Sequence, residues 1–192
     1  MRICVYSGAS AQVHPDFLAT AHSLGERLAQ AGHSLVYGGG STGLMGAVAD
    51  GAMAHGGEVI GILPKFMADL QWGHPGLTEL RMVENMRERK HLLLTDSDAV
   101  IALPGGCGTL EELFEAITLK QLGIYFNPII LLNTRNYYEP LNSFMQKAID
   151  ERFMNIGHNA MWSMVDSVSE VLPIILSTPK WRADARDFAV VR

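Results

Sequence analysis

The stretch Leu103-Pro-Gly-Gly-Cys-Gly-Thr-Leu-Glu-Glu112 decides the fold class and locates the functional site. The apolar run that leads into it, residues 99–103, predicts a buried strand, and apolar residues recur at helical spacing after it. A strand, a glycine turn and a helix N-terminus together bind anions, because free backbone N–H groups and the positive end of the helix dipole point at the turn. Glycine has no Cβ, so the backbone can approach a phosphate closely. The stretch therefore predicts a phosphate site at the start of a helix.

Two carboxylates, Glu111 and Glu112, follow the glycine turn directly. A loop that only holds phosphate has no need of them, so they indicate chemistry on a phosphorylated substrate. The alternative interpretation of Glu112 is structural. Thr109-x-x-Glu112 has the spacing of a capping box, in which the Glu carboxylate accepts from the backbone N–H of the N-cap residue. A functional carboxylate beside a phosphate would need cations nearby.

The helix expected over residues 86–95 supplies such cations. At about 100° per residue, Met86 and Leu93 point in the same inward direction. Arg89 and Lys90 flank that direction, which places two cations beside the apolar stripe. The alternative is that both side chains run along the surface with solvated charges. Because this helix directly precedes the strand at 99–103, we expect its cations to reach the phosphate site.

Composition restricts the class of protein. The chain has 192 residues, of which 48% are hydrophobic, enough for one domain with a full core. Its net charge of -5 gives no electrostatic support to nucleic-acid binding, and no apolar run is long enough to span a membrane. The N-terminus does not have the shape of a signal peptide, and two distant cysteines fit a reducing, cytoplasmic setting. Neither the cysteines nor the histidines have the spacing of metal ligands, so we expect no metal.

Strands and helices alternate along the chain. Buried strands are expected at residues 3–7, 34–37, 58–63, 79–83, 99–103 and 128–132. Helices are expected directly after the glycine turn, near Phe153, and at residues 15–31, 47–54, 86–95, 137–149 and 168–176. Because the strands are continuously apolar, we expect a parallel sheet covered on both faces, the doubly wound α/β fold of the Rossmann type. A single domain should span residues 1–180, with a flexible tail at 181–192.

A second glycine motif, Gly38-Gly-Gly-Ser-Thr-Gly43, lies between a predicted strand and a predicted helix and satisfies G-x-G-x-x-G. That context is typical of NAD-binding folds. The acidic residue that should follow about 20 positions later does not fit, because Glu58 begins a strand rather than ending one. The motif is therefore interpreted as a turn that lines a pocket, packs a helix closely on the sheet and adds phosphate contacts.

Cys107 stands at the expected helix N-terminus, a position that activates thiols as nucleophiles. No histidine is recognisably placed to serve as its base. We therefore expect Cys107 to be a small residue in a variable position, and its replacement by alanine to retain most activity.

Two motifs resemble those of a known family. Pro104-Gly-Gly-Cys-Gly-Thr-Leu-Glu-Glu112 matches the P-G-G-x-G-T-x-x-E signature of the LOG ("Lonely Guy") proteins, and Met86-Arg-Glu-Arg-Lys90 resembles their M-H-x-R-K element. The resemblance covers nearly the whole chain, from Ser7-Gly-Ala-Ser10 to Gln121-Leu-Gly123. LOG proteins, long labelled lysine decarboxylases, are phosphoribohydrolases that split cytokinin riboside 5′-monophosphates into free base and ribose 5-phosphate, and some bacterial relatives prefer AMP. The resemblance implies this activity here, in a homodimer with no metal or organic cofactor.

Carried over position by position, the resemblance implies that Arg89 and Glu112 form the catalytic pair. It also implies substrate contacts from Lys90, Gly105, Gly106, Cys107, Gly108, Thr109, Leu110, Glu111 and Thr118. Arg87 departs from the family, because it replaces the usual histidine. The loop of residues 65–78 also looks longer than in plant members, in which it carries a substrate-contacting glutamate. So long a loop inside a compact domain is often functional.

The chemistry of these residues agrees with the implied reaction. Cleavage of a ribosyl C–N bond develops positive charge on the sugar, and a carboxylate such as Glu112 can stabilise that charge or activate water. Arg89 can hold the phosphate or the leaving side. No lysine has the context of a pyridoxal site, which argues against lysine decarboxylation. Two alternatives stay open: an AMP nucleosidase with no cytokinin role, and a nucleotide-binding carrier or sensor that does no chemistry.

Overall fold

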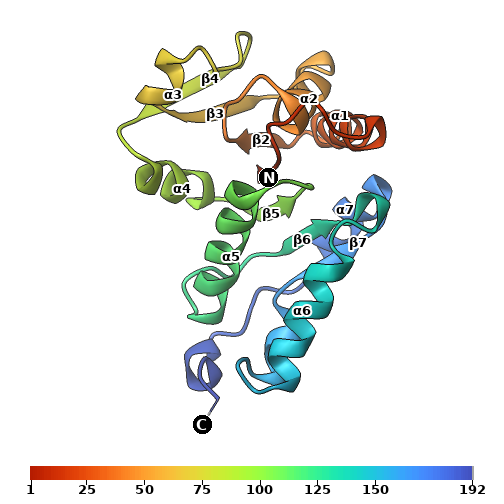
Figure 1. Cartoon of the computed structure of the whole chain (residues 1–192), viewed down its shortest axis with the longest axis vertical. Coiled ribbons are helices and arrows are strands. Elements are labelled where there is room, and N and C mark those ends of the chain that lie inside the picture. The colour runs from red at the N-terminus through yellow and green to blue at the C-terminus, as the bar shows by residue number, and fades with distance from the viewer. Residues whose placement is uncertain (192) are drawn as a thin grey trace.

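The computed structural model, which describes residues 1–191, contains a seven-stranded sheet in the order β4-β3-β2-β1-β5-β6-β7 (Figure 1). Every neighbouring pair of strands is parallel. The strands are β1 (Arg2–Tyr6), β2 (Ser34–Tyr37), β3 (Val59–Pro64), β4 (Glu79–Val83), β5 (Ala99–Ala102), β6 (Ile129–Leu132) and β7 (Ser163–Val165). The strand order reverses between β1 and β5, where Ile3 pairs with Ala99. The predicted doubly wound α/β fold is therefore confirmed, and this pair marks its switch point.

Helices cover both faces of the sheet. They are α1 (Pro15–Gln30), α2 (Gly43–Ala54), α3 (Lys65–Asp69), α4 (Met86–Leu94), α5 (Cys107–Gln121), α6 (Glu139–Asp150) and α7 (Val168–Ser177). Short 3-10 turns follow at η1 (Thr134–Asn136), η2 (Ile156–Ala160) and η3 (Ala185–Phe188). Within residues 1–191, no helix is both long and apolar enough to cross a membrane.

Side chains of one strand alternate between two hydrophobic cores. Along β1, Ile3 and Val5 belong to the core that contains α1, α2 and α7. Cys4 and Tyr6 belong to the other core, which contains α4, α5 and α6. Because both faces of the sheet are covered, the central strands β1, β2 and β5 are apolar apart from Arg2 and Ser34 at their first positions, which explains the apolar runs of the sequence.

Two elements were not expected from the sequence. β7 is only three residues long, Ser163–Val165, and so gives no readable pattern. The long loop of residues 65–78 begins with α3, a helix of five residues that has no buried side chain and therefore no apolar stripe. β7 is held in the sheet by its pairing with β6, and neither element has a local sequence pattern that predicts it.

Within the segment expected to be a flexible tail, residues 181–191 are mostly exposed but contact the rest of the domain at several points, and Arg192 lies outside the described residues. Trp181 N donates to Phe126 O at 2.7 Å, and the Trp181 ring covers the buried Lys120 ammonium, 5.6 Å from the ring centroid. Ala189 O accepts from the Gln121 side chain at 2.7 Å. The segment therefore packs on the C-terminal turns of α5, where a helix leaves carbonyl groups unpaired and where this chain buries a cation.

Candidate active site

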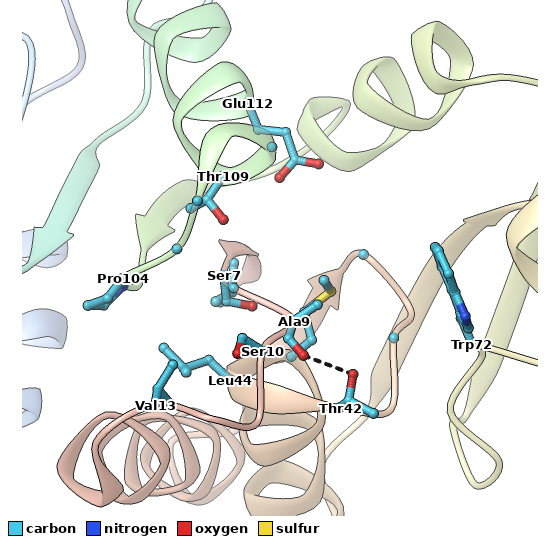
Figure 2. Close-up of a pocket in the computed structure, with 18 of the residues that line it drawn as sticks. Ser7, Ala9, Ser10, Val13, Thr42, Leu44, Trp72, Pro104, Thr109 and Glu112 are labelled. Atoms are coloured by element: carbon cyan, nitrogen blue, oxygen red, sulfur yellow. Dashed lines mark hydrogen bonds between the residues drawn. The ribbon is translucent and has the colours of Figure 1, made fainter.

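A cavity of about 600 Å³ opens at the carboxyl ends of β1, β2 and β5 (Figure 2). It lies beside the switch point between β1 and β5, where doubly wound folds bind their ligands. Three loops meet there: the β1–α1 loop, the glycine turn before α2 and the glycine turn before α5. The cavity has a polar wall from α5 and a largely apolar wall from α2, α3 and the loop after α3.

The polar wall begins at the start of α5. The N-cap of this helix is Gly106, which has no side chain to cap the first turn. Within residues 1–191, the backbone N–H groups of Cys107, Gly108 and Thr109 have no acceptor. Gly105 is required here, because a Cβ at this position would lie 2.1 Å from Thr109 Oγ1. The predicted arrangement of an anion site, three free amides at a helix N-terminus, is present.

The capping-box interpretation of Glu112 is wrong. α5 begins three residues earlier than that interpretation required, because Gly106 rather than Thr109 occupies the N-cap position. Glu112 therefore belongs to the second turn of the helix, where its carboxylate is too far along the chain to reach the N-cap. It is 8% exposed and lines the cavity. Its Oε1 atom accepts from Arg89 Nη1 at 2.8 Å.

Arg89 reaches Glu112 from α4 through the interior. Arg89 Nε donates to Ile62 O at 3.0 Å, and Nη2 donates to Gly38 O at 3.2 Å. A Cβ on Gly38 would lie 2.0 Å from Arg89 Nη2, so glycine at this position makes room for the guanidinium. The planar guanidinium fork is thus fixed by two carbonyls and one carboxylate. Arg89 holds Glu112 in place and has little freedom to follow a ligand.

Burial and neighbouring charges set the state of Glu112. Burial raises the pKa of its carboxyl above 4.5, and the Arg89 guanidinium opposes that rise. Glu111 and Glu115 raise the pKa further, whereas Lys90 lowers it. Glu112 Oε2 has no partner within the described chain. The second oxygen is therefore available to a group in the cavity.

Lys90 lies on the other side of α4 from the cavity. Its ammonium pairs with Glu111, and with Glu115 Oε2 at 3.1 Å, across the contact between α4 and α5. These carboxylates raise the pKa of Lys90, the Glu111 hydrogen bond most strongly. Lys90 and Glu115 line a separate groove together with Arg87. Lys90 and Glu111 therefore neutralise each other outside the cavity.

The structure divides the predicted site residues into two groups. Six of them line the cavity: Arg89, Gly105, Gly106, Gly108, Thr109 and Glu112. Five do not line it: Lys90, Cys107, Leu110, Glu111 and Thr118. Of these, Cys107, Glu111 and Thr118 are exposed, so their side chains face solvent rather than the cavity.

The glycine motif before α2 lines the cavity with Gly38, Gly40 and Thr42, but the helix that follows it has fewer free amides than α5. The backbone N–H groups of Leu44 and Met45, which begin this helix, both donate to Gly8 O, at 2.9 and 3.3 Å. A Cβ on Gly43 would lie 2.4 Å from Ala9 C, so the glycine allows the β1–α1 loop to cross the start of α2. The motif therefore lines the pocket, as the sequence interpretation expected, and it also packs a loop against a helix. The amides of Leu44 and Met45 are used internally.

Several cavity residues were not predicted from the sequence. Ser7, at the end of β1, lines the cavity and is 6% exposed. Met67 and Trp72, from the loop of residues 65–78, line its apolar side, and Tyr137 reaches it from before α6. The length of the loop was the only signal for Met67 and Trp72. Nothing in the local sequence singles out Tyr137, whose hydroxyl donates to Gly105 O at 2.7 Å.

The loop that carries Trp72 is fastened to the glycine motif before α2. Ser41 N donates to Trp72 O at 3.1 Å, and His74 N donates to Gly39 O at 2.9 Å. His74 Nε2 also lies 3.0 Å from Asp50 Oδ1 on α2. These contacts hold the half-exposed indole at the apolar side, across the cavity from Pro104 and Thr109 (Figure 2).

The sequence of the chain is similar to that of a protein family and of several plant enzymes. A family described as "possible lysine decarboxylase" matches residues 45–175. The cytokinin riboside 5′-monophosphate phosphoribohydrolase LOG7 of Arabidopsis thaliana is 45% identical over 80% of this chain and 71% of the relative. The phosphoribohydrolase LOG of Oryza sativa subsp. japonica is 44% identical over 80% of this chain and 63% of the relative, so the chain spans less than two thirds of that protein.

Solved structures have the same fold. The molybdenum cofactor binding protein of Rippkaea orientalis superposes with a TM-score of 0.71 at 27% identity, over 92% of this chain and 95% of that one. The molybdenum cofactor carrier protein of Chlamydomonas reinhardtii has a TM-score of 0.71 at 21% identity, over 92% and 96% of the two chains. The second likeness concerns the fold alone. With the extent of the family match and the identity to the plant enzymes, this chain belongs to the LOG family of lysine decarboxylase-like proteins.

Proposed function

We propose that this chain hydrolyses the N-glycosidic bond of a nucleoside 5′-monophosphate and releases a free base and ribose 5-phosphate. One observation carries the proposal: a buried carboxylate, Glu112, lines the same cavity as three unpaired amides at the start of its own helix. Phosphate binding alone needs the amides but not the carboxylate. The plant relatives named above are phosphoribohydrolases by name, which supports the same reaction here.

The spacing on α5 suits a nucleotide. Thr109 and Glu112 are three residues apart, so they share one face of the helix, about 4.5 Å apart along its axis. We propose that the 5′-phosphate accepts hydrogen bonds from the N–H groups of Cys107, Gly108 and Thr109. The sugar then lies beside Glu112, one turn further along. The phosphate anchors the substrate, and its binding energy is used to bring the anomeric carbon to the carboxylate.

In the proposed reaction, the bond between C1′ of ribose and the base nitrogen breaks, and its electron pair leaves with the base. The sugar develops oxocarbenium character, and the negative charge of Glu112 stabilises it or takes a proton from the attacking water. The water oxygen bonds to C1′, one proton of the water goes to the base, and ribose 5-phosphate remains. Arg89 is a positioning residue that keeps Glu112 ionised and oriented. Within residues 1–191, no lysine lines the cavity to form a Schiff base, which argues against amino-acid decarboxylation.

The apolar side of the cavity supports a purine with an apolar substituent as the natural base. Met45, Leu63, Met67, Trp72 and Met86 form this side. A hydrophobic group on the base would be buried there, as the cytokinin names of the plant relatives suggest. The alternative is an AMP nucleosidase, for which the same wall packs an unsubstituted adenine.

A second candidate function is a carrier that binds a nucleotide-like cofactor without chemistry. The specific observation that favours it is the superposition with the molybdenum cofactor binding protein. One assay separates the candidates. The purified chain is incubated with AMP, with isopentenyladenosine 5′-monophosphate and with adenosine, and the products are separated. We expect base and ribose 5-phosphate from the monophosphates and much slower release from adenosine. Binding of the monophosphates without release of base would favour the carrier, and comparable turnover of adenosine would remove the phosphate anchor from the mechanism.

We further propose that the chain acts as a homodimer in the cytoplasm, with no metal or organic cofactor and no nucleic-acid partner. Within residues 1–191, no three His, Cys, Asp or Glu side chains are grouped to hold a metal ion. The net charge of -5 disfavours a nucleic-acid surface. Light scattering on the purified chain tests the dimer, and activity in the presence of a chelator tests the independence from metal.

A further inference from the structure

Ser7 carries a buried hydroxyl whose partner is missing. It directly follows β1, lines the cavity and is 6% exposed (Figure 2). Within residues 1–191, Ser7 Oγ has no hydrogen-bond partner. Buried polar atoms nearly always have one, because an unpaired hydroxyl costs the energy of its lost hydration. Since the side chain borders the cavity, the natural partner is a group that enters it.

Ser7 lies at the end of the cavity that is formed by the start of α5, where the phosphate is proposed to bind. Gly8 N, the next backbone group, donates to Pro104 O at 3.0 Å. A Cβ on Gly8 would lie 3.1 Å from the Cα of Gly105, and a Cβ on Gly105 would lie 2.1 Å from Thr109 Oγ1. The end of β1 is therefore packed directly against the start of α5. In Figure 2, Ser7 and Thr109 are drawn on the same side of the cavity, and Trp72 lies across it at the apolar side.

We propose that Ser7 Oγ donates a hydrogen bond to the substrate phosphate bound at the start of α5. The backbone amides of Cys107, Gly108 and Thr109 approach that phosphate from the helix, and Ser7 approaches it from the end of β1. A phosphate offers only acceptor oxygens, so it suits the unpaired O–H group. The inference rests on the phosphate-binding half of the proposed function and does not depend on hydrolysis.

This assignment has a consequence for stability that a structural role would not have. In the free protein the hydroxyl of Ser7 is buried without compensation, so its removal relieves a cost. Ser7→Ala should therefore melt at the same temperature as the natural chain or higher, while it binds phosphate more weakly. A serine that held the fold together would show the opposite, a lower melting temperature with unchanged affinity per folded molecule.

The experiment measures binding by calorimetry with three probes: AMP, inorganic phosphate and adenosine. For Ser7→Ala, we expect the affinity for AMP and for phosphate to fall about tenfold or more, the scale of one hydrogen bond to a charged group. The affinity for adenosine should not change. Ser7→Cys, which retains a weak donor, should be intermediate. Ser34→Ala is the control, because Ser34 begins β2 at the amino ends of the strands, away from the cavity, where its hydroxyl donates to Met1 O at 3.4 Å.

Three results would overturn the assignment. They are an unchanged affinity for AMP, an equal loss for adenosine and AMP, and a lower melting temperature without a specific loss of phosphate binding. Failure of the proposed function has a different outcome. If AMP binding depends on Ser7 but the natural chain releases no base, the chain is a nucleotide carrier and the role of Ser7 stands.

Discussion

Arg89 Nη1 lies 2.8 Å from Glu112 Oε1, and both side chains are more than nine-tenths buried. The pair joins α4 to α5 across the end of the sheet. Each charge is buried with the other as its main compensation, so neither side chain can be removed without leaving an unpaired charge in the interior. The pair therefore links the integrity of the fold to the state of the proposed catalytic carboxylate.

Glu112→Gln tests the negative charge of the Glu112 side chain separately from its shape. The amide keeps the size of the side chain and an oxygen that accepts from Arg89, but it carries no negative charge toward the sugar. We expect a folded variant that still binds AMP and loses about 100-fold or more in kcat, the scale of a lost electrostatic partner of the transition state. Single-turnover hydrolysis of AMP, together with a melting curve, checks this. Near-normal hydrolysis would move the chemistry away from Glu112.

Arg89→Lys should disturb the orientation of the Glu112 carboxylate while it keeps a positive charge nearby. Lysine keeps a cation near Glu112 but cannot donate at once to Ile62 O, Gly38 O and the carboxylate. We expect kcat to fall tenfold or more with a small change in the affinity for AMP, because the guanidinium is already occupied by protein acceptors. The exposed Arg87, on the same helix, provides the control variant Arg87→Lys. A large loss of AMP affinity in Arg89→Lys would mean that the arginine binds the phosphate itself.

The raised pKa of Glu112 determines whether the free energy of unfolding rises or falls with pH. Between the unfolded and the raised folded pKa, the folded state holds more protons, so the free energy of unfolding falls as pH rises through that window. Glutamine does not titrate there. The melting temperature of Glu112→Gln relative to the natural chain should therefore be higher at pH 7 than at pH 4. Catalysis should have the opposite trend, since it needs the carboxylate, and kcat/KM should fall as pH falls through the pKa of Glu112. If the melting temperatures of Glu112→Gln and the natural chain differed by the same amount at pH 7 and at pH 4, the pKa of Glu112 would not be raised in the folded state.

Cys107→Ala should retain most activity. The thiol is exposed and does not line the cavity, and only the backbone N–H of this residue belongs to the anion site. Alanine keeps that N–H. AMP hydrolysis is measured for Cys107→Ala and for the natural chain after treatment with iodoacetamide. If only the treated natural chain loses activity, the bulky adduct blocks the site and the thiol is not the nucleophile. A loss of about 1,000-fold in the alanine variant would identify the thiol as catalytic.

Trp72→Ala should change the choice of base. The indole forms part of the apolar side of the cavity, so its loss removes a surface against which a hydrophobic substituent packs. We expect kcat/KM for isopentenyladenosine 5′-monophosphate to fall by about tenfold more than that for AMP, the scale of a few buried methylene groups. Trp72→Phe should preserve most of the preference. Equal losses for both substrates would assign Trp72 to the purine ring or to the loop, rather than to the substituent.

Most of the order of the elements could be predicted because the central strands are almost entirely apolar and each long helix has its own signals. The residue at which α5 begins was harder to predict. Thr109 followed by Glu112 has the pattern of a cap, whereas the true N-cap, Gly106, has no side chain to reveal it. A glycine can end a turn or begin a helix, so the local sequence does not show at which residue the helix begins.

The site was predictable in the part that one helix carries. Gly106, Gly108, Thr109 and Glu112 are close together in sequence and line one cavity. Contacts between elements were not predictable in this way. The side of α4 on which Lys90 lies depends on how α4 crosses α5, and that crossing pairs Lys90 with Glu111 and Glu115. Ser7 and Trp72 depend in the same way on loops that meet only in the fold.

Two helix N-termini meet at the switch point, and the chain has closed one of them. At the start of α2, the amides of Leu44 and Met45 are held by the carbonyl of Gly8, whereas at the start of α5 the amides of Cys107, Gly108 and Thr109 have no acceptor within residues 1–191. A nucleoside diphosphate that used both helix ends would have to place its second anionic group against a carbonyl oxygen. For the phosphate site proposed at the start of α5, this difference predicts that AMP, with one phosphate, binds more tightly than ADP or ATP, whose second phosphate would meet a carbonyl oxygen rather than free amides.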